Sequence, residues 1–101
     1  MTTRAVFRST GSYLPERVLT NKEMESIVDT TDEWIMQRSG IAQRHIAGDD
    51  ENTADMAIKA AAQALERSGL SPDEIDTVIV ATTTPDQTFP SVAVKVQAAL
   101  D

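Results

Sequence analysis

The chain of 101 residues carries a formal net charge of −7 and has a pI of about 4.5, which argues against a broad basic footprint for nucleic acid. It contains no Cys, and therefore no disulfide, thiolate metal site or thiol nucleophile. No apolar run approaches the roughly 20 residues that span a bilayer, and the first ten residues lack the apolar stretch of a signal peptide. We therefore expect a soluble cytoplasmic protein, built as one small domain or as a piece of a larger one, that binds neither nucleic acid nor membrane.

Two elements are expected before residue 29. Residues 4–9 mix β-forming side chains with Arg and end at a turn over 10–12, which predicts a strand. Thr20 and Glu23 have the spacing of a capping box, and apolar side chains recur at 24, 27 and 28. This spacing predicts a short amphipathic helix.

A second helix start holds the only Trp of the chain. Thr30 can cap this helix, Glu33 can reach back to the cap, and Gly40 is placed to end the helix. Trp34 and Arg38 are four residues apart, so they share one helix face. Either Trp34 is a half-buried anchor with Arg38 lying over it, or the pair offers a surface to a flat anionic ligand.

The next stretch carries the only His. Residues 41–47 alternate imperfectly and predict a short strand, followed by an acidic loop over 48–52. His45 has no second His or Cys to share a metal, and the loop lacks the spaced ligands of a calcium site. We expect His45 to be a partly exposed surface residue and expect no metal site.

The remainder alternates helices with one strand. A helix is predicted over 53–68 with Gly69 as its left-handed stop, and Ser71–Pro72 predict a single further turn. The β-branched run over 77–82 predicts a strand buried on both faces. Phe89-Pro90-Ser91 open a last helix, with Pro90 in its first turn and residues 92, 96 and 99 or 100 on one face. The order β-α-α-β-α-β-α indicates an α/β fold, a sheet with helices packed on it.

Chemistry-bearing motifs are scarce. The sequence has no GxGxxG, Walker or GxSxG motif, and the hydroxyls at 82–84 and 91 have no identifiable base beside them. Composition and spacing therefore assign no catalytic residue. They predict an α/β domain with one surface formed by an aromatic residue and an arginine, and nothing more specific.

Several segments together resemble a known family. The sequence is similar to the amino-terminal part of β-ketoacyl-acyl-carrier-protein synthase III, a thiolase-like condensing enzyme, from about residue 6 to residue 100. The segments that carry the resemblance are TGSYLPERVLTN (10–21), TTDEWIMQRSGI (30–41), RHIA (44–47), SGL (68–70) and DTVIVATTTPDQTFPS (76–91). The resemblance implies a thiolase-like α/β fold.

The resemblance also implies an activity. This family works as a homodimer and condenses an acyl-CoA, often acetyl-CoA, with malonyl-acyl-carrier protein to begin fatty-acid synthesis. Its catalytic Cys, His and Asn match no position of residues 1–101, and His45 does not match the catalytic His. The resemblance thus makes residues 1–101 the amino-terminal part of a thiolase-like domain, truncated before the catalytic Cys and inactive alone.

Four residues match positions with a role in the family. The resemblance implies that Trp34 stacks on the adenine of CoA, that Arg38 meets its phosphate end and that Thr30 lies beside the base. Phe89 matches a residue that crosses the dimer interface and helps to close the partner's acyl pocket. The CoA thioester is a substrate, so no cofactor is expected.

Two residues depart from the pattern of this family, and two alternative functions stay open. Ser39 replaces a common Thr, and Ala42 occupies a position that is often basic, which weakens a local contact to an acidic carrier protein. The chain could instead be a non-catalytic module that binds CoA or dimerises in its own right. It could also be a purely structural α/β piece in which Trp34 is simply packed.

Overall fold

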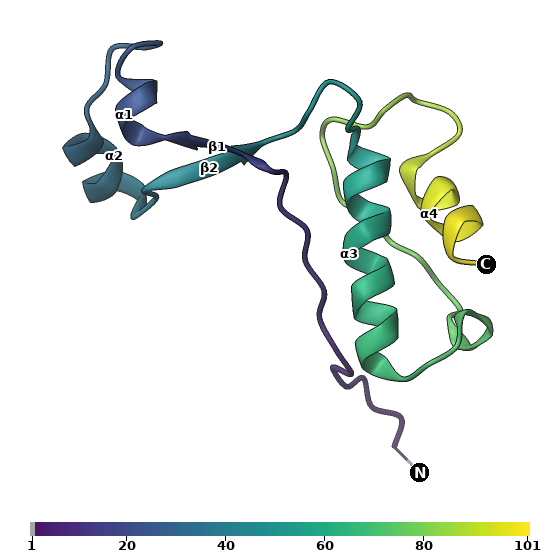
Figure 1. The fold of residues 1–101 in the computed structure, drawn as a ribbon. Helices are drawn as coiled ribbons and strands as arrows, with labels where there is room; N and C mark the ends of the chain where they lie inside the picture. The colour runs from purple at the N-terminus through teal and green to yellow at the C-terminus, as the bar shows by residue number, and fades with distance from the viewer. Residues whose placement is uncertain (1) are drawn as a thin grey trace. The chain divides into compact units, whose positions relative to one another are not determined.

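The computed structural model describes residues 2–101, which divide into two compact units. We call residues 14–50 the sheet unit, and residues 2–13 with 51–101 the helix unit. The sheet unit contains β1 (Arg17–Thr20), α1 (Asn21–Met24), α2 (Asp32–Ser39) and β2 (Gln43–Ile46) (Figure 1). The helix unit contains α3 (Thr53–Ser68), the single 3-10 turn η1 (Pro72–Glu74) and α4 (Val92–Leu100). The expected α/β class, a sheet with helices, is confirmed.

The sheet unit is built on a two-stranded antiparallel sheet. β1 pairs with β2 in a register that sets Arg17 opposite Ile46 and Thr20 opposite Gln43. The strand expected over 41–47 is present but shorter, at Gln43–Ile46, whereas β1 was not expected, because its four residues run directly into the cap of α1.

The predicted capping box at the start of α1 is confirmed. Thr20 Oγ1 accepts from the Glu23 amide at 3.2 Å, and Glu23 Oε2 accepts from the Thr20 amide at 3.0 Å. The expected extension of this helix through Val28 is wrong, because α1 ends at Met24 and turns follow. Ile27 and Val28 are exposed, so no buried apolar face continues the helix.

The predicted stop of α2 is confirmed, but its predicted cap is wrong by one residue. Thr31 caps α2 by accepting from the Trp34 amide at 3.1 Å, and Thr30 lies outside the helix. Glu33 does not reach back and instead accepts from Gln37 one turn further on, at 3.4 Å. Gly40 follows α2 with a φ of 72°, the left-handed conformation in which Gly carries no steric penalty.

The helix unit has an apolar core where α3 meets α4. Ala54 of α3 and Val92 and Val96 of α4 are buried. The partly buried residues around them are Ala57, Ile58, Ala61, Val80 and Leu100. The predicted bounds of α3, its left-handed Gly69 and the single turn after Ser71 are confirmed.

The two strands predicted for this unit are wrong. Residues 4–9 and 77–82 are irregular, and no ladder pairs either segment within residues 2–101. A strand requires a hydrogen-bonded neighbour. The side chains of Phe7 and Ile79 are 99% and 87% exposed, so these segments are not covered by other elements either. The prediction for α4 also needs a correction, because Ser91 is its N-cap and Pro90 precedes the helix instead of lying in its first turn.

The amino-terminal segment runs along α3 (Figure 1). Ser9 Oγ donates to the Ala64 carbonyl at 2.5 Å, and the Ser12 amide donates to Gln63 Oε1 at 2.9 Å. Between them Gly11 approaches the helix so closely that a Cβ there would overlap the Ala60 carbonyl oxygen and lie 2.5 Å from the Ala64 amide nitrogen. This close approach, and not a turn alone, explains the glycine at position 11.

Tyr13 attaches the end of the same segment. Its hydroxyl donates to a Glu51 carboxylate oxygen, which raises the pKa of Tyr13 above its ordinary value. Lys59 of α3 lies 4.5 Å from the centre of the Tyr13 ring, a cation–π distance.

Candidate functional site

The candidate nucleotide-binding face lies on α2 and consists of Trp34 and Arg38. The Arg38 guanidinium carbon lies 5.5 Å from the centre of the Trp34 ring. Trp34 is 55% exposed, so it is half-buried with Arg38 over it and still offers surface to a ligand. The predicted shared face is thus confirmed, and we call it the Trp34–Arg38 face.

This face has the chemistry of a nucleotide site. An indole ring offers a flat apolar surface for stacking, and a guanidinium group presents several N–H donors that match phosphate oxygens. Cation–π attraction holds Arg38 near the ring, and this attraction contributes about 0.5–1 kcal/mol at exposed sites. The arrangement can therefore offer a stacking surface and a cation to one flat anionic ligand.

Thr30 lies just before the cap of α2. Its hydroxyl oxygen is buried and has no hydrogen-bond partner within residues 2–101. A buried hydroxyl without a partner is uncommon, because it loses its hydrogen bonds to water. Thr30, four residues before Trp34, therefore has a hydroxyl whose hydrogen-bonding capacity remains unused in the described part of the chain.

Phe89, the fourth predicted residue, lies in the helix unit, in the loop over 83–90. Its side chain is 83% exposed. Two contacts attach the loop to the start of α3: Thr53 Oγ1 donates to the Thr84 carbonyl at 2.6 Å, and the Ala54 amide donates to Asp86 at 2.9 Å. Phe89 is thus presented outward from a loop that is attached to a helix end.

Asp86 also contacts the last helix. Lys95 Nζ of α4 lies 3.4 Å from Asp86 Oδ2. The hydrogen bond from the Ala54 amide, and then Lys95, hold the pKa of the Asp86 carboxyl below its ordinary value. Asp86 therefore joins α3, α4 and the Phe89 loop in the ionised state.

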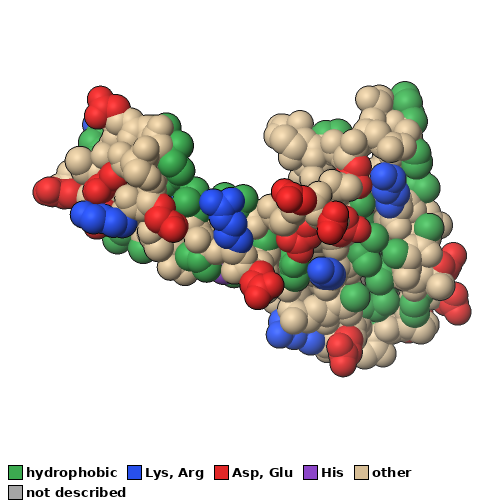
Figure 2. Space-filling model, turned by 45° about the horizontal axis from the view of Figure 1, so that its top comes forward, with side chains coloured by type: hydrophobic (Ala, Val, Ile, Leu, Met, Phe, Trp, Pro, Cys, Tyr) green, Lys and Arg blue, Asp and Glu red, His purple; other side chains and the backbone are tan. Residues whose placement is uncertain are grey.

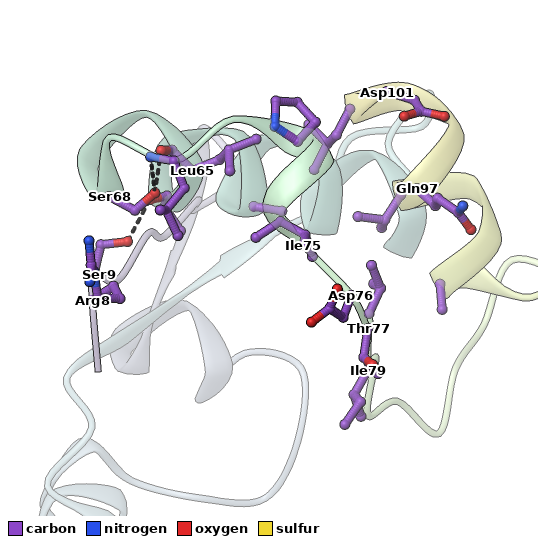
Figure 3. Close-up of a pocket in the computed structure, with 18 of the residues that line it drawn as sticks. Arg8, Ser9, Leu65, Ser68, Ile75, Asp76, Thr77, Ile79, Gln97 and Asp101 are labelled. Atoms are coloured by element: carbon purple, nitrogen blue, oxygen red, sulfur yellow. Dashed lines mark hydrogen bonds between the residues drawn. The ribbon is translucent and has the colours of Figure 1, made fainter. Parts of the chain in front are cut away.

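The described residues also form an open groove in the helix unit, with a volume of about 760 Å³ (Figure 3). It contains none of the four predicted site residues. Two of its hydroxyls are engaged locally, since Ser9 donates to the Ala64 carbonyl and Ser68 donates to the Leu65 carbonyl at 2.7 Å. The residues labelled along it are Arg8, Ser9, Leu65, Ser68, Ile75, Asp76, Thr77, Ile79, Gln97 and Asp101.

His45 lies on β2 and is partly exposed, as expected. Its Nδ1 is 2.6 Å from the Pro15 carbonyl oxygen. A carbonyl can only accept, so Nδ1 carries the hydrogen and donates it. This contact gives His45 a structural partner within the sheet unit.

The surface carries mixed charge. On the face shown in Figure 2, Asp and Glu side chains are interspersed with Lys and Arg and with apolar patches. Within residues 2–101, no helix is both long enough and apolar enough to cross a membrane.

Sequence reasoning missed a buried polar residue that contacts α2. Asn21 is 1% exposed, and its side chain contacts Asp32, Ile41 and Arg44. Its only signal in the sequence is its place next to the helix cap at Thr20, which does not reveal burial.

Comparison with known proteins identifies relatives of this chain, although no family model matches it. A β-ketoacyl-acyl-carrier-protein synthase III of Sinorhizobium medicae is 64% identical over 94 residues, which are 93% of this chain and 29% of that protein. One of Cereibacter sphaeroides is 61% identical over 100 residues, 99% of this chain and 31% of that protein.

Solved structures agree with these relatives. The 3-oxoacyl-acyl-carrier-protein synthase III of Aquifex aeolicus matches with a TM-score of 0.85 at 53% identity, over 92% of this chain and 30% of that one. The priming β-ketosynthase of the R1128 polyketide pathway also matches with a TM-score of 0.85, at 40% identity over 93% of this chain and 28% of that one. Sequence and fold together place the chain in the thiolase-like α/β class. More narrowly, the chain is a homologue of β-ketoacyl-acyl-carrier-protein synthase III, and it spans about 30% of the length of these relatives.

Proposed function

We propose that this chain supplies the nucleotide-binding face of an enzyme that condenses acyl-CoA with malonyl-acyl-carrier protein at the start of fatty-acid synthesis. The observation that carries the proposal is Arg38 lying over an exposed Trp34 in a chain 64% identical to a synthase III. In this proposal the adenine stacks on Trp34, Arg38 meets the phosphates, and Thr30 lies beside the base. We assign no catalytic residue to residues 1–101, which form one part of a thiolase-like domain.

The proposal includes a cytoplasmic homodimer. Phe89 is the residue that we assign to the contact with the partner subunit and its acyl pocket. Its exposure and the attachment of its loop to α3 and α4 support this assignment, because a fixed, exposed aromatic side chain suits an interface.

Binding of CoA tests the first part of the proposal. Trp34 is the only Trp of the chain, so its emission reports directly on the Trp34–Arg38 face. Titration with CoA should quench this emission, whereas pantetheine, which lacks the adenine nucleotide, should not. No response at millimolar CoA, or equal quenching by pantetheine, would refute the assignment of this face.

Matched variants define the role of Arg38. Arg38→Ala should weaken CoA binding about tenfold in calorimetry, because a charge-assisted contact to phosphate is lost. Lys22→Ala removes the same charge from α1, where Lys22 pairs with Glu25 at 3.5 Å, and should leave the affinity within about twofold. Equal losses in the two variants would indicate a general charge effect and not a site.

Sedimentation tests the dimer. Phe89→Asp should lower self-association, since it places a charge in the proposed interface. Phe7→Asp is the matched control, because Phe7 is also fully exposed and belongs to the same unit. Equal effects of the two substitutions would contradict a specific role for Phe89.

A further inference from the structure

We propose that Asn21 is the positioning residue of the Trp34–Arg38 face, because its side-chain amide holds α2 at both of its ends. The inference rests on the proposed function for its consequence in CoA binding, while the positioning itself is measurable without any ligand.

Helix α2 lacks a fully buried apolar anchor. None of its eight residues is buried. Isolated helices of fewer than about 12–15 residues are marginal in water, and most helices in proteins are stabilised by packing of an apolar face. Only Ile35 of α2 is partly buried, so the position of this helix depends largely on polar contacts and on the chain segments at its two ends.

Asn21 supplies these contacts at both ends. Its Nδ2 donates to Asp32 Oδ1 at 2.8 Å, and Asp32 is the first residue of α2. The same Nδ2 donates to the Ile41 carbonyl at 2.7 Å, and Ile41 follows the Gly40 stop of α2. One amide group thus joins the residue that opens the helix to the residue that leaves it.

The orientation of this amide is determined by its partners. Arg44 Nη2 of β2 lies 2.8 Å from Asn21 Oδ1, and a guanidinium can only donate. A backbone carbonyl can only accept, so Nδ2 must face Ile41. Both N–H donors of the side chain and one acceptor position of its oxygen are therefore used, in an environment that leaves Asn21 1% exposed.

The backbone of Asn21 adds to the connection. Its amide donates to the Ala42 carbonyl at 3.1 Å, next to the sheet register that sets Thr20 opposite Gln43. Asp32 has a second contact, since its amide donates to Glu25 Oε1 at 2.9 Å. The sheet, α1 and both ends of α2 are thus linked through one buried polar residue.

The consequence lies in the direction of Trp34 and Arg38. A helix fixed at both ends presents these side chains in one orientation, so the ligand does not have to order them on binding. Loss of the Asn21 contacts would leave α2 attached by its flanking segments and by the contact of the Asp32 amide with Glu25. The face would then lose affinity even in molecules that are still folded.

Two substitutions with matched geometry separate positioning from simple folding. Asn21→Asp keeps the acceptor for Arg44 but sets a carboxylate against Asp32 and the Ile41 carbonyl. Asp32→Asn keeps an acceptor for Asn21 and should behave like the unmodified chain. In the double variant Asn21→Asp/Asp32→Asn, the new amide can donate to the new carboxylate, which should restore part of the loss.

Two measurements are made on the folded fraction, as defined by urea unfolding followed by circular dichroism. Without ligand, Asn21→Asp should lower the fluorescence anisotropy of Trp34 and increase its quenching by acrylamide, while Asp32→Asn leaves both unchanged. With CoA, Asn21→Asp should weaken binding about tenfold, Asp32→Asn less than about twofold, and the double variant by an intermediate factor.

The outcomes decide the proposal separately from the proposed function. Unchanged anisotropy and quenching in folded Asn21→Asp would overturn the positioning role, whatever the CoA result. If Asn21→Asp does not fold, Asp32→Ala replaces it, because Asp32 is exposed and its carboxylate has Asn21 as its one hydrogen-bond partner within residues 2–101. Looser Trp34 in that variant supports positioning, and unchanged Trp34 overturns it. A chain that does not bind CoA but loses Trp34 order in these variants would refute the CoA site and support the role of Asn21.

Discussion

The sheet unit and the helix unit are each stabilised internally by a different kind of contact. In the helix unit, buried Ala54, Val92 and Val96 bring α3 and α4 together through apolar packing. In the sheet unit, the residue buried most completely is Asn21, and its contacts are hydrogen bonds. Apolar packing has no preferred direction, whereas a hydrogen bond weakens steeply as its angle departs from linear. The sheet unit, which carries the Trp34–Arg38 face, is thus the unit whose geometry depends more on the direction of its hydrogen bonds.

Gly11→Ala, which adds a single methyl group to the helix unit, should cause the largest loss of stability among the substitutions considered. A Cβ at this position meets backbone atoms of Ala60 and Ala64, which cannot rotate away. We expect a loss of about 3 kcal/mol in the free energy of unfolding, measured by urea denaturation. Ser12→Ala, in the same segment, should cost less than about 0.5 kcal/mol, and a similar small loss for Gly11→Ala would contradict the close approach.

Val96→Ala tests the packing side of the comparison. Val96 is 3% exposed between α3 and α4, so the substitution removes buried methyl groups and leaves a cavity. We expect a loss of about 2 kcal/mol. Val94→Ala, on the exposed face of the same helix, is the matched control and should have little effect. Equal losses would show that the α3–α4 contact does not stabilise this unit.

The two left-handed glycines allow the same change in each unit. Gly40 after α2 and Gly69 after α3 have φ values of 72° and 73°, and a Cβ at either meets nothing within 4 Å. Alanine should therefore cost about 1 kcal/mol at each position through the backbone alone. Because α2 has no buried side chain, Gly40→Ala should also reduce amide protection along the whole of α2 in hydrogen exchange. Gly69→Ala should reduce protection only in the last turn of α3, and an identical pattern in the two helices would contradict the comparison.

The smallest expected effect is a pH dependence of the Phe89 loop. The pKa of Asp86 is lowered in the folded chain, so its contribution is present above the ordinary pKa of Asp and is lost as the pH falls through the lowered value. The loop should therefore stay attached at pH values where an unperturbed Asp is already protonating. Fluorine NMR of a chain labelled at its two Phe residues would follow Phe89, with Phe7 as the internal control. Lys95→Ala should move the transition of the Phe89 signal to higher pH, and an unchanged midpoint would remove Lys95 from the cause.

What the sequence predicts well here is local. The bounds of α3, the stops at Gly40 and Gly69 and the shared face of Trp34 and Arg38 follow from spacings within a few residues. The cap of α2 was misplaced by one residue, because Thr30 and Thr31 are adjacent and chemically equivalent as caps.

What the sequence could not predict depends on distant partners. The β-branched run over 77–82 has the composition of a strand, but a strand exists only with a neighbour, and none pairs with it within residues 2–101. The burial of Asn21 depends on contacts to Asp32, Ile41 and Arg44, up to 23 positions away. The lowered pKa of Asp86 likewise depends on a hydrogen bond from the Ala54 amide, 32 positions away. The local pair on α2 was therefore predictable, and the contacts that orient it were not.

The contact of Gly11 with α3 has a consequence for how this sequence can vary. The atoms that a side chain at position 11 would meet belong to the backbone of Ala60 and Ala64, and every residue type has the same backbone. A compensating substitution in α3 therefore cannot make room for a larger residue at position 11. In a library of random double mutants, substitutions of Gly11 should therefore have no suppressor at positions 60 or 64. The loss of stability at position 11 is then not compensated by a second substitution in α3.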